Sequence, residues 1–537
     1  MAASTPPFTE EYIVRSPKPP STESLPKVSV AEMMVEKISS YDKELLALID
    51  TNNNSNVTYG QLHERAAQFA SALLRLGVEK TDFVMFYGEN SFEYIIAMLG
   101  TVYLGLPFCP IPPSSQSFEL SEQSRGANGT ILVFGTEKVA IVERTATEAA
   151  YRETMRQFKV LVQMETAKPS EALKQLAVLK ESGALIHSFE EMISQVAEGD
   201  NGPQLKIIPH FAVDLKAEFL LCFTSGTSGV PKPAIHSHRS IALSMTRASW
   251  GNRSVGLPFI MWHPLGHVSG TFIALYTLYA GCSVILFEKS DLEPILQAVE
   301  RYKAINFMMS ANQAAPLAAI DYHKKYDLSS LKAINHGGSF IATSMLLAIR
   351  AKYKVATINV YGSTEFIDCV EGYGQPEVDE FLVGCVGHVK QGVEMKIVDL
   401  QTGKPLPPNE NGEICFRGES CFSGYKGNPE ATAKTIVDGW YHSGDVGYYD
   451  TQGRLFITDR IKEMIKYKLY SLIPAEIEDF VQRHPAVASA CVVGVPHASE
   501  GHHIRAYVEL VQGQKKTWAH KRNFEPASAS LTPCLAR

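Results

Sequence analysis

The sequence lacks a Cys-x-x-Cys pair, an excess of basic residues and an apolar leader. Its nine cysteines are scattered over 537 residues, which fits a reducing compartment and argues against a disulfide framework or a clustered zinc site. Lysine and arginine total 50 against 57 acidic residues, a net charge of −7 that gives no reason to expect a nucleic-acid-binding face. Residues 1–30 are rich in Pro, Ser and Glu, so we expect no secretion signal.

Long apolar runs free of glycine and proline are also missing. Residues 94–118 and 254–287 carry no Asp, Glu, Lys or Arg, but both stretches are punctuated by several glycines and prolines. A spanning helix needs about 20 consecutive, predominantly apolar residues. The punctuation favours a buried helix followed by a buried strand, so we expect no transmembrane segment.

What the sequence does contain is an alternation of helix and strand patterns. A capping-box spacing at Thr58 and Gln61 predicts a helix that Gly77 can close. Further helices are expected at 92–104 and 291–303, and strands at 81–87, 106–111, 282–287, 304–309 and 357–360. Strands that alternate with helices predict an α/β fold with mainly parallel sheets covered on both faces.

The pattern changes after about residue 380. Short alternating strands at 393–399, 412–417 and 453–458 predict an antiparallel, β-barrel-like subdomain. A helix opening at Pro474 and strands at 492–495 and 506–511 predict a small α+β unit. We therefore expect an α/β chain: a large N-terminal domain of two α/β subdomains with mainly parallel sheets plus the β-barrel-like subdomain, followed by a small, incomplete C-terminal domain. The expected bounds are 1–30 (disordered), 31–459 (large domain), 460–512 (small domain) and 513–537 (divergent tail, disordered).

The segment richest in chemistry follows a predicted buried strand at 219–223. It reads Thr224, Ser225, Gly226, Thr227, Ser228, Gly229, Val230, Pro231 and Lys232. Backbone N–H groups, hydroxyls and one cation in such a loop suit a polyanion such as a nucleotide triphosphate, although a plain surface turn is the commoner meaning of such residues. The Walker-type P-loop is excluded, because Lys232 lies between two prolines and is not followed by Ser or Thr.

Three further clusters are candidates. Tyr361, Gly362, Ser363, Thr364 and Glu365 follow a predicted strand, where α/β sheets place ligands and where an aromatic ring and a carboxylate suit adenine and magnesium. His442–Asp445 is predicted to form a tight turn whose aspartate can accept from ribose hydroxyls, and residues 459–462 mark the domain boundary. Solvated turns are the alternative in each case. His263 and His267 are four apart, but Pro264 and Gly266 between them disfavour a helical metal site.

The order of these segments resembles the adenylate-forming superfamily of acyl-CoA ligases, 4-coumarate–CoA ligases and beetle luciferases, over roughly residues 57–511. The likeness rests on residues 223–232, 361–365, 440–445 and 459–468. It implies activation of a carboxylic acid with ATP and Mg²⁺ to an acyl-adenylate, followed by transfer to coenzyme A, with a small-molecule acid as the partner. Such transfer depends on positioning and charge neutralisation.

The resemblance also implies roles. Thr224–Gly229 and Lys232 would hold the β- and γ-phosphates. Tyr361 would pack on adenine, beside Gly362 and Ser363, while Thr364 would reach the α-phosphate and Glu365 would hold magnesium. Asp445 would grip the ribose, with Arg460 nearby. His267 would stand at the acyl pocket, and Gly337, Gly338 and Ser339 would wall it from the nucleotide. Lys462 would lie at the hinge of the small domain, and Lys468 would be one of the cofactor-binding residues.

The sequence departs from the family pattern at several positions. Pro233 stands in place of a usual glycine, His336 in place of a small residue, and Leu469 in place of a glycine that lets coenzyme A pass. The family's Pro-Lys-Thr-x-x-Gly-Lys element does not occur after the strand at 506–511, and Lys515, Lys516 and Lys521 lack that motif. We therefore expect weak adenylation by this form, whose tail resembles an alternative exon or a frameshift.

Other functions remain open from the sequence alone. One is a non-catalytic module that retains nucleotide or fatty acid, and another is a luciferase-like monooxygenase. A medium- or long-chain fatty acid is the first expected substrate and a phenylpropanoid acid the second. The chain's last residues, Leu535-Ala-Arg537, are not a peroxisomal signal, so we expect this form in the cytoplasm, with a peroxisomal location open for a fuller-length sibling.

Overall fold

The structure is a computed structural model of the chain. The described residues are 11–18, 27–51, 55–199, 211–224, 231–247, 255–338, 341, 343–372, 384–461, 464–467, 470–472, 474–482, 484, 486–497 and 501–510.

The first α/β unit is built on a sheet with the strand order β20-β10-β9-β5-β4-β6-β7-β8. Its parallel part comprises β9 (Glu218–Phe223), β5 (Phe108–Ile111), β4 (Val84–Tyr87), β6 (Ile131–Phe134), β7 (Val160–Gln163) and β8 (Leu185–Ser188). The strands β10 (Pro233–Ser237) and β20 (Gly424–Tyr425) extend one edge in antiparallel fashion.

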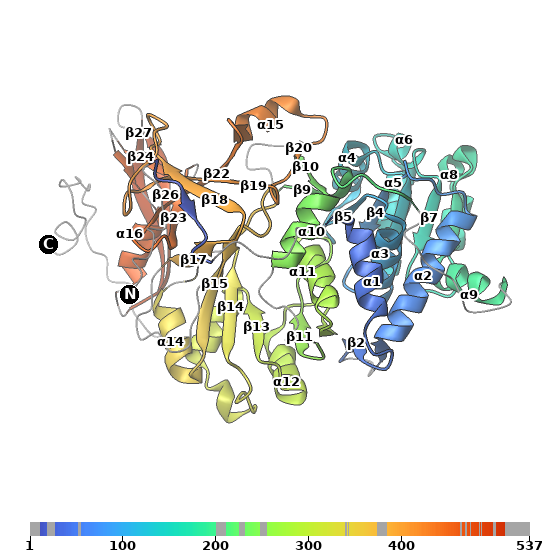
Figure 1. The fold of residues 1–537 in the computed structure, drawn as a ribbon, viewed down its shortest axis with the longest axis horizontal. Helices are drawn as coiled ribbons and strands as arrows, with labels where there is room; N and C mark the ends of the chain where they lie inside the picture. Colours follow the sequence, from blue (N-terminus) through green and yellow to red (C-terminus); the bar gives the residue numbers. More distant parts are fainter. Residues whose placement is uncertain are drawn as a thin grey trace.

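Helices cover both faces of this sheet (Figure 1). Alternate residues of β4 point to opposite sides: Val84 and Phe86 pack with α2 (Tyr59–Arg75), α3 (Phe92–Leu104) and α9 (Phe189–Gly199). Met85 and Tyr87 pack on the other side, toward α4 (Ser117–Ala127), α5 (Val139–Thr147) and α8 (Ala177–Ser182). All four residues are fully buried, as expected for a strand between two helical layers.

The second α/β unit contains two smaller sheets. One has the order β11-β12-β2-β3, with β11 (Pro258–Met261), β12 (Ser283–Leu286), β2 (Leu46–Asp50) and β3 (Asn56–Thr58). The other is wholly parallel, with β13 (Asn306–Met309), β14 (Ala333–Gly337) and β15 (Ala356–Val360). Helices α12 (Leu292–Tyr302), α13 (Ala311–Ala319) and α14 (Thr343–Tyr353) pack on these strands, and α11 (Val268–Tyr279) packs toward the first unit.

The antiparallel part follows the order β1-β18-β19-β22-β23-β17-β16, with β21 paired to β22. Its strands are β1 (Val14–Arg15), β18 (Val393–Val398), β19 (Gly412–Gly418), β22 (Trp440–Tyr449), β23 (Leu455–Arg460), β17 (Cys385–Val389), β16 (Val370–Glu371) and β21 (Ile436–Val437). The chain thus brings β1, from near its start, beside strands almost four hundred residues later. This sheet closes the space above β13–β15 (Figure 1).

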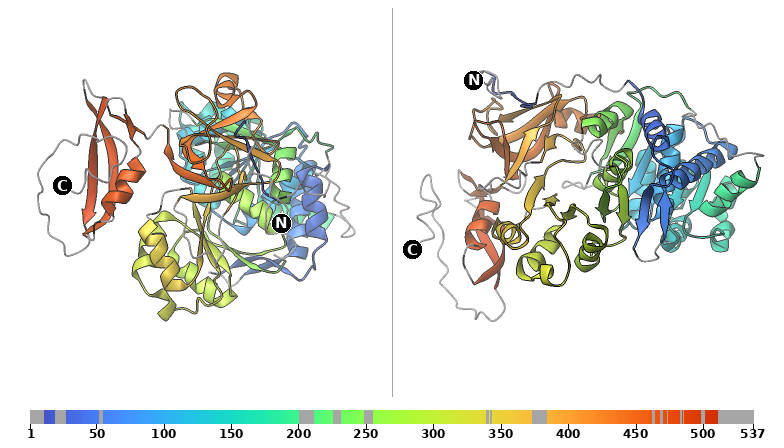
Figure 2. Two further views of the ribbon diagram at one scale, coloured as in Figure 1. Left: turned by 60° about the vertical axis from the view of Figure 1, so that its left-hand side comes forward. Right: turned by 60° about the horizontal axis from the view of Figure 1, so that its bottom comes forward.

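A small α+β unit ends the described chain. Its sheet has the order β25-β24-β27-β26, and α16 (Pro474–Gln482) packs on β26 (Val487–His497). The other strands are β24 (Ile465–Tyr467), β25 (Tyr470–Leu472) and β27 (Gly501–Leu510). Figure 2 shows this unit standing to one side of the larger part.

The predicted fold class and its mainly parallel sheets are confirmed, and so are most of the elements. The helix predicted at 92–104 is α3 with the same bounds, and the expected capping box at Thr58 opens α2. Strands differ at their ends: β4 begins at Val84 rather than 81, since Asp82 there accepts hydrogen bonds from Glu79 N and Thr130 Oγ1. No helix of the described segments is long and apolar enough to cross a bilayer.

The Thr58 cap yields a first prediction. Thr58→Ala removes the side-chain acceptor of Gln61 N, and loss of such a cap costs about 1 kcal/mol. We expect amide exchange in the first turn of α2 to accelerate roughly fivefold. Gln68→Ala, on the same helix but away from its end, serves as the control. Equal exchange in both variants would contradict the capping role.

Candidate functional site

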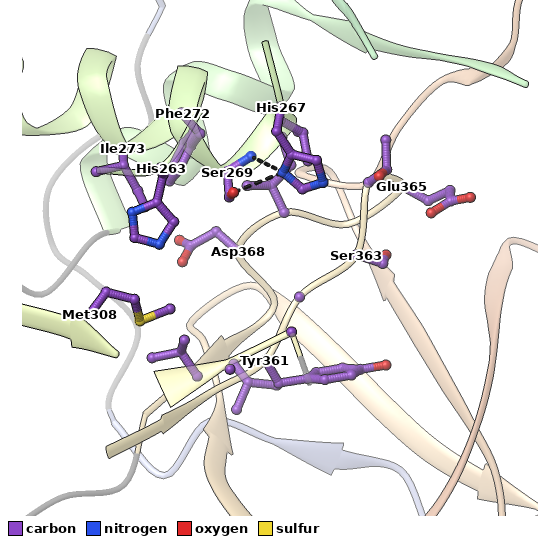
Figure 3. A pocket seen from close by; sticks show the side chains of 18 of the residues that line it. His263, His267, Ser269, Phe272, Ile273, Met308, Tyr361, Ser363, Glu365 and Asp368 are labelled. Carbon is purple, nitrogen blue, oxygen red and sulfur yellow. Dashed lines mark hydrogen bonds between the residues drawn. The ribbon is translucent and has the colours of Figure 1, made fainter. Parts of the chain in front are cut away.

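Within the described residues, a cavity of about 1010 Å³ lies where the two α/β units and the antiparallel sheet meet. The parallel strands β13–β15 end on it, β22 and β23 wall it from above, and α11 and the base of the loop after β9 close the rest. Figure 3 shows that its side chains come from segments distant in sequence. Those predicted from sequence are Thr224, Lys232, His267, Gly337, Gly338, Tyr361, Gly362, Ser363, Thr364, Glu365, Asp445 and Arg460.

Some predicted residues lie outside the described part. These are Ser225, Gly226, Thr227, Ser228 and Gly229, together with Ser339, Lys462, Lys468 and the divergent Leu469. The base of the glycine-rich loop is described. Thr224 N donates to Lys232 O at 2.9 Å, and Lys232 N donates to Thr224 Oγ1 at 3.4 Å. The two bonds hold Thr224 and Lys232 together between β9 and β10, and both residues line the cavity.

The segment after β15 carries a dense set of hydrogen bonds. His236 Nε2–H donates to Thr364 O at 2.7 Å, which fixes the backbone between β15 and the cavity. The Glu365 carboxylate accepts from the Tyr425 hydroxyl at 2.6 Å through Oε1. Lys232 Nζ lies 5.5 Å from the centre of the same Tyr425 ring. Tyr425 therefore holds the predicted phosphate-binding lysine and the predicted metal-binding carboxylate near one another.

Asp445 is held from two sides. Tyr361 donates its hydroxyl to Asp445 Oδ2 at 2.6 Å, and Arg460 Nε lies 3.1 Å from Oδ1. Burial, and next the Asp445 charge, raise the pKa of Tyr361 well above its usual value, so the phenol stays a donor. A carboxylate held in this orientation suits a pair of ligand hydroxyls.

The predicted tight turn at His442–Asp445 is wrong. These residues lie within strand β22, which runs without interruption from Trp440 to Tyr449. Gly444 has φ = 73°, a left-handed value that glycine adopts without strain, and its N–H is accepted by Glu413 Oε1 at 3.2 Å. The register of the neighbouring strands shifts here, so the aspartate is presented by an irregularity in a strand.

His267 is the N-cap of α11, facing the cavity. Its Nδ1 accepts from Ser269 N at 3.2 Å and lies 2.8 Å from Ser269 Oγ. Surrounding protein atoms lower the pKa of His267, so the ring is neutral near pH 7. Because Nδ1 is the acceptor, Nε2 carries the proton and is the donor that the ring offers to a ligand.

Gly337, at the end of β14, allows a close approach. A Cβ there would lie 2.3 Å from Val360 O, so any side chain would push β14 and β15 apart. Next to it, nothing lies within 4 Å of where a Gly338 Cβ would stand, which leaves bare backbone along the cavity wall. The divergent His336 is 5% exposed, and burial lowers its pKa to about 4.

Sequence reasoning missed several residues that build this site. Tyr425 and Tyr441 line the cavity, and Tyr441 shares a hydrogen bond of 2.9 Å with Ser363. Glu413 bonds both Gly444 N and His442 Nδ1, the latter at 2.8 Å. Tyr425 follows a glycine and Glu413 lies in a predicted strand, and neither pattern indicates a contact with a segment many residues away. Asp368, also missed, lines the cavity and accepts a hydrogen bond from Lys390 Nζ.

Comparison with known proteins identifies the family. The family model for the AMP-binding enzyme matches residues 36–426, and that for the AMP-binding enzyme C-terminal domain matches residues 476–524. The chain belongs to the AMP-binding enzyme family. It is thus an adenylate-forming enzyme, as the four sequence segments indicated, and members of this superfamily activate acids with ATP.

Relatives of this AMP-binding enzyme align along most of its length. The 4-coumarate–CoA ligase of Vanilla planifolia is 28% identical over 91% of this chain and 85% of its own length. The luciferin 4-monooxygenase of Photinus pyralis is 29% identical over 91% of this chain and 85% of its own length. Among solved structures, an amide bond synthetase from Marinactinospora thermotolerans has a TM-score of 0.75 at 24% identity, covering 91% of this chain and 90% of its own. ATP-bound MatB from Rhodopseudomonas palustris has the same values. These structural likenesses establish the fold.

The charged and hydrogen-bonding groups of this cavity suit a nucleotide and a divalent metal ion. It combines a cation at Lys232, a carboxylate at Glu365, an acceptor pair at Asp445 and bare backbone at Gly338. Mg²⁺ prefers oxygen ligands. Tyr425 binds Oε1 of Glu365, and Oε2 of the same carboxylate is the oxygen that could bind the metal ion.

The buried His236 yields a pH prediction. It is fully buried, and burial lowers its pKa to about 4, below the value of about 6.5 expected in the unfolded chain. The unfolded chain therefore binds more protons between these values, and stability that is fully present above pH 6.5 falls as the pH drops toward 4.

We expect His236→Gln to reduce the pH slope of the unfolding free energy by roughly 1.4 kcal/mol per pH unit in this window. The slope will not vanish, because His263 and His336 also have pKa values lowered to about 4. The measurement is denaturant unfolding between pH 7.5 and 5, with the exposed His323→Gln as control. Parallel profiles for wild type and His236→Gln would contradict the assignment.

Proposed function

We propose that this protein activates a carboxylic acid as its acyl-adenylate and transfers the acyl group to coenzyme A. One observation carries the proposal: Lys232, Glu365 and Asp445, which come from three distant segments, line one cavity that continues into an apolar chamber beside α11. The names of the relatives that act on coenzyme A support the choice of a thiol as acceptor.

The adenylation step needs positioned charges more than a nucleophile of the protein. A carboxylate oxygen of the acid attacks the α-phosphorus of ATP, the bond to pyrophosphate breaks, and the acyl-adenylate forms. Lys232 would balance the charge of the leaving phosphates, and the Asp445 carboxylate would accept the ribose hydroxyls. Glu365 would hold Mg²⁺, whose chemistry there is to neutralise phosphate charge.

The transfer step uses the same chamber. The thiol sulfur attacks the acyl carbonyl carbon, the bond to AMP breaks, and the thiol proton passes to solvent. The neutral His267 ring, with its Nε2–H toward the cavity, is placed to donate to an acyl oxygen, and the bare backbone at Gly338 lets a flat substrate lie close. We propose that Lys462 lies at the hinge of the small domain and that Lys468 contributes to cofactor binding, as the family resemblance implies.

The acyl chamber favours an aryl acid over the fatty acid that ranked first from sequence. Its apolar walls are flat and aromatic: Phe272 stacks on Tyr276 with ring centroids 6.3 Å apart, and Trp262 stacks on His263 at 4.3 Å. Aromatic walls of this kind suit a planar substrate. The names of several relatives as 4-coumarate ligases agree with this order.

The test measures pyrophosphate release with a panel of aryl and fatty acids. Glu365→Gln should lower kcat by about 10²–10³-fold, since one positioned charge is lost, and Asp445→Asn should raise the KM for ATP. Glu430→Gln on α15 (Pro429–Thr435), an exposed carboxylate paired with Lys434, is the matched control. Unchanged turnover in the two cavity variants would refute the proposal. Tight ATP binding without AMP formation would instead favour a binding module.

A luciferase-like reaction is the second candidate, supported by the Photinus pyralis relative. Light emission from added luciferin, ATP and oxygen would single it out, and light absent from a preparation that forms AMP would favour the ligase.

A further inference from the structure

Three side chains of the kinds that bind metal ions meet on the antiparallel sheet. Glu413 and Cys415 are two residues apart on β19, so both point to the same face of the sheet. His442, on the neighbouring strand β22, is the direct cross-strand partner of Cys415 (Figure 1). Among the described residues, these three form the group of His, Cys and acidic side chains whose ligand atoms all lie within 4.8 Å of one another.

The cluster has a buried sulfur and a partly exposed edge. The residues on either side of Cys415 belong to the main apolar core of this sheet, whereas Cys415 itself packs with Trp440 in a smaller cluster on the other face. Cys415 is fully buried. The side chains of Glu413 and His442 are 17% and 26% exposed, so an ion from solvent can reach the group past them.

The distances between the three ligand atoms are close to those of a tetrahedral zinc site. His442 Nδ1 lies 3.5 Å from Cys415 Sγ and 2.8 Å from Glu413 Oε2. Zinc binds sulfur at about 2.3 Å and nitrogen or oxygen at about 2.0–2.2 Å, which places tetrahedral ligand atoms roughly 3.3–3.6 Å apart. The sulfur and nitrogen already have this separation, and the nitrogen and oxygen need to move apart by only about half an ångström.

The chemistry of the group favours zinc over magnesium. A thiolate, an imidazole and a carboxylate are ligands that Zn²⁺ takes, whereas Mg²⁺ prefers oxygen ligands alone. The thiolate and the carboxylate together balance a divalent charge. The absence of a Cys-x-x-Cys pair argues only against a zinc site within one local segment, because Cys415 and His442 are 27 residues apart and are brought together by strand pairing.

We propose that Glu413, Cys415 and His442 form a binding site for Zn²⁺ or another thiophilic divalent cation, with water as the fourth ligand. Bonds form from the metal ion to Cys415 Sγ, His442 Nδ1 and Glu413 Oε2. The thiol proton passes to solvent, and the imidazole carries its proton on Nε2. This site is distinct from the cavity that contains Glu365, and it does not depend on the reaction assigned to that cavity.

The site is connected to the cavity through the other oxygen of Glu413. Glu413 Oε1 accepts from Gly444 N at 3.2 Å, and Gly444 directly precedes Asp445. A metal ion on Oε2 fixes the Glu413 carboxylate, and a fixed carboxylate holds the Gly444 N–H more firmly. The bound ion therefore cross-links β19 and β22 and stabilises the strand irregularity that presents Asp445.

The test uses Co²⁺ as the probe, because a thiolate ligand gives Co²⁺ an intense near-ultraviolet charge-transfer band. Full-length protein, freed of metal with a chelator, is titrated with Co²⁺ in excess Mg²⁺, and Zn²⁺ is then added to displace the Co²⁺. We expect one thiolate-bound Co²⁺ per chain. Cys415→Ser should abolish the band. His442→Gln should weaken binding at least roughly 100-fold, since loss of a merely supporting partner of a metal ligand already costs about 10–100-fold.

Two control variants locate the ion. Cys491→Ser removes an exposed thiol on β26, and Glu365→Gln removes the carboxylate proposed to hold Mg²⁺ in the cavity. Both should keep the band and the affinity, so a failure of the proposed reaction leaves this result unchanged. Absence of the band in the wild type, its loss in either control, or displacement of Co²⁺ by Mg²⁺ would overturn the site.

Amide exchange gives a second measurement that depends on the position of the ion. Zn²⁺ should slow exchange of the Gly444 N–H in the wild type and leave it unchanged in His442→Gln. Equal exchange with and without bound Zn²⁺ in the wild type would place the ion elsewhere and overturn the assignment. Thermal unfolding without metal checks that each variant is folded, and the partly exposed His442→Gln carries the test if Cys415→Ser does not fold.

Discussion

The hydrogen bond from Tyr361 to Asp445 ties the site together, because it joins the end of a parallel strand to an antiparallel sheet. Neither sheet alone forms the cavity. With Arg460 on the other carboxylate oxygen, three segments converge on one side chain. A charge held by a phenol and a guanidinium is already oriented before a ligand arrives, so little ordering remains to be done on binding.

The polar contacts around this clamp follow one arrangement throughout the site. Groups predicted to meet substrate are each held by a second group: Glu365 by Tyr425, Thr364 by His236, Asp445 by Tyr361 and His267 by Ser269. The supporting groups come mostly from other segments of the chain. The rigidity of the site therefore depends on the packing of separate subdomains, and a substitution distant from the cavity can change the orientation of its side chains.

How much of this was predictable from sequence depends on the range of the interaction. The helix at 92–104 was found with its bounds, since apolar content, a serine cap and a closing glycine are local signals. The prediction of a tight turn around Gly444 was wrong, because glycine next to serine and aspartate is typical of both a turn and an irregularity within a strand. Only the pairing with β19 and β23 distinguishes the two. Tyr425, Glu413 and Asp368 were missed because their partners lie 22 to 60 residues away, beyond any local pattern.

The connection to the C-terminal unit has a mechanical consequence. Ile461 N donates to Gly444 O at 2.9 Å, one residue after Arg460 contacts Asp445. The chain is thereby clamped to β22 up to Ile461. Any rotation of α16 and β24–β27 as a body would therefore pivot after Ile461 and leave the contact between Arg460 and Asp445 in place.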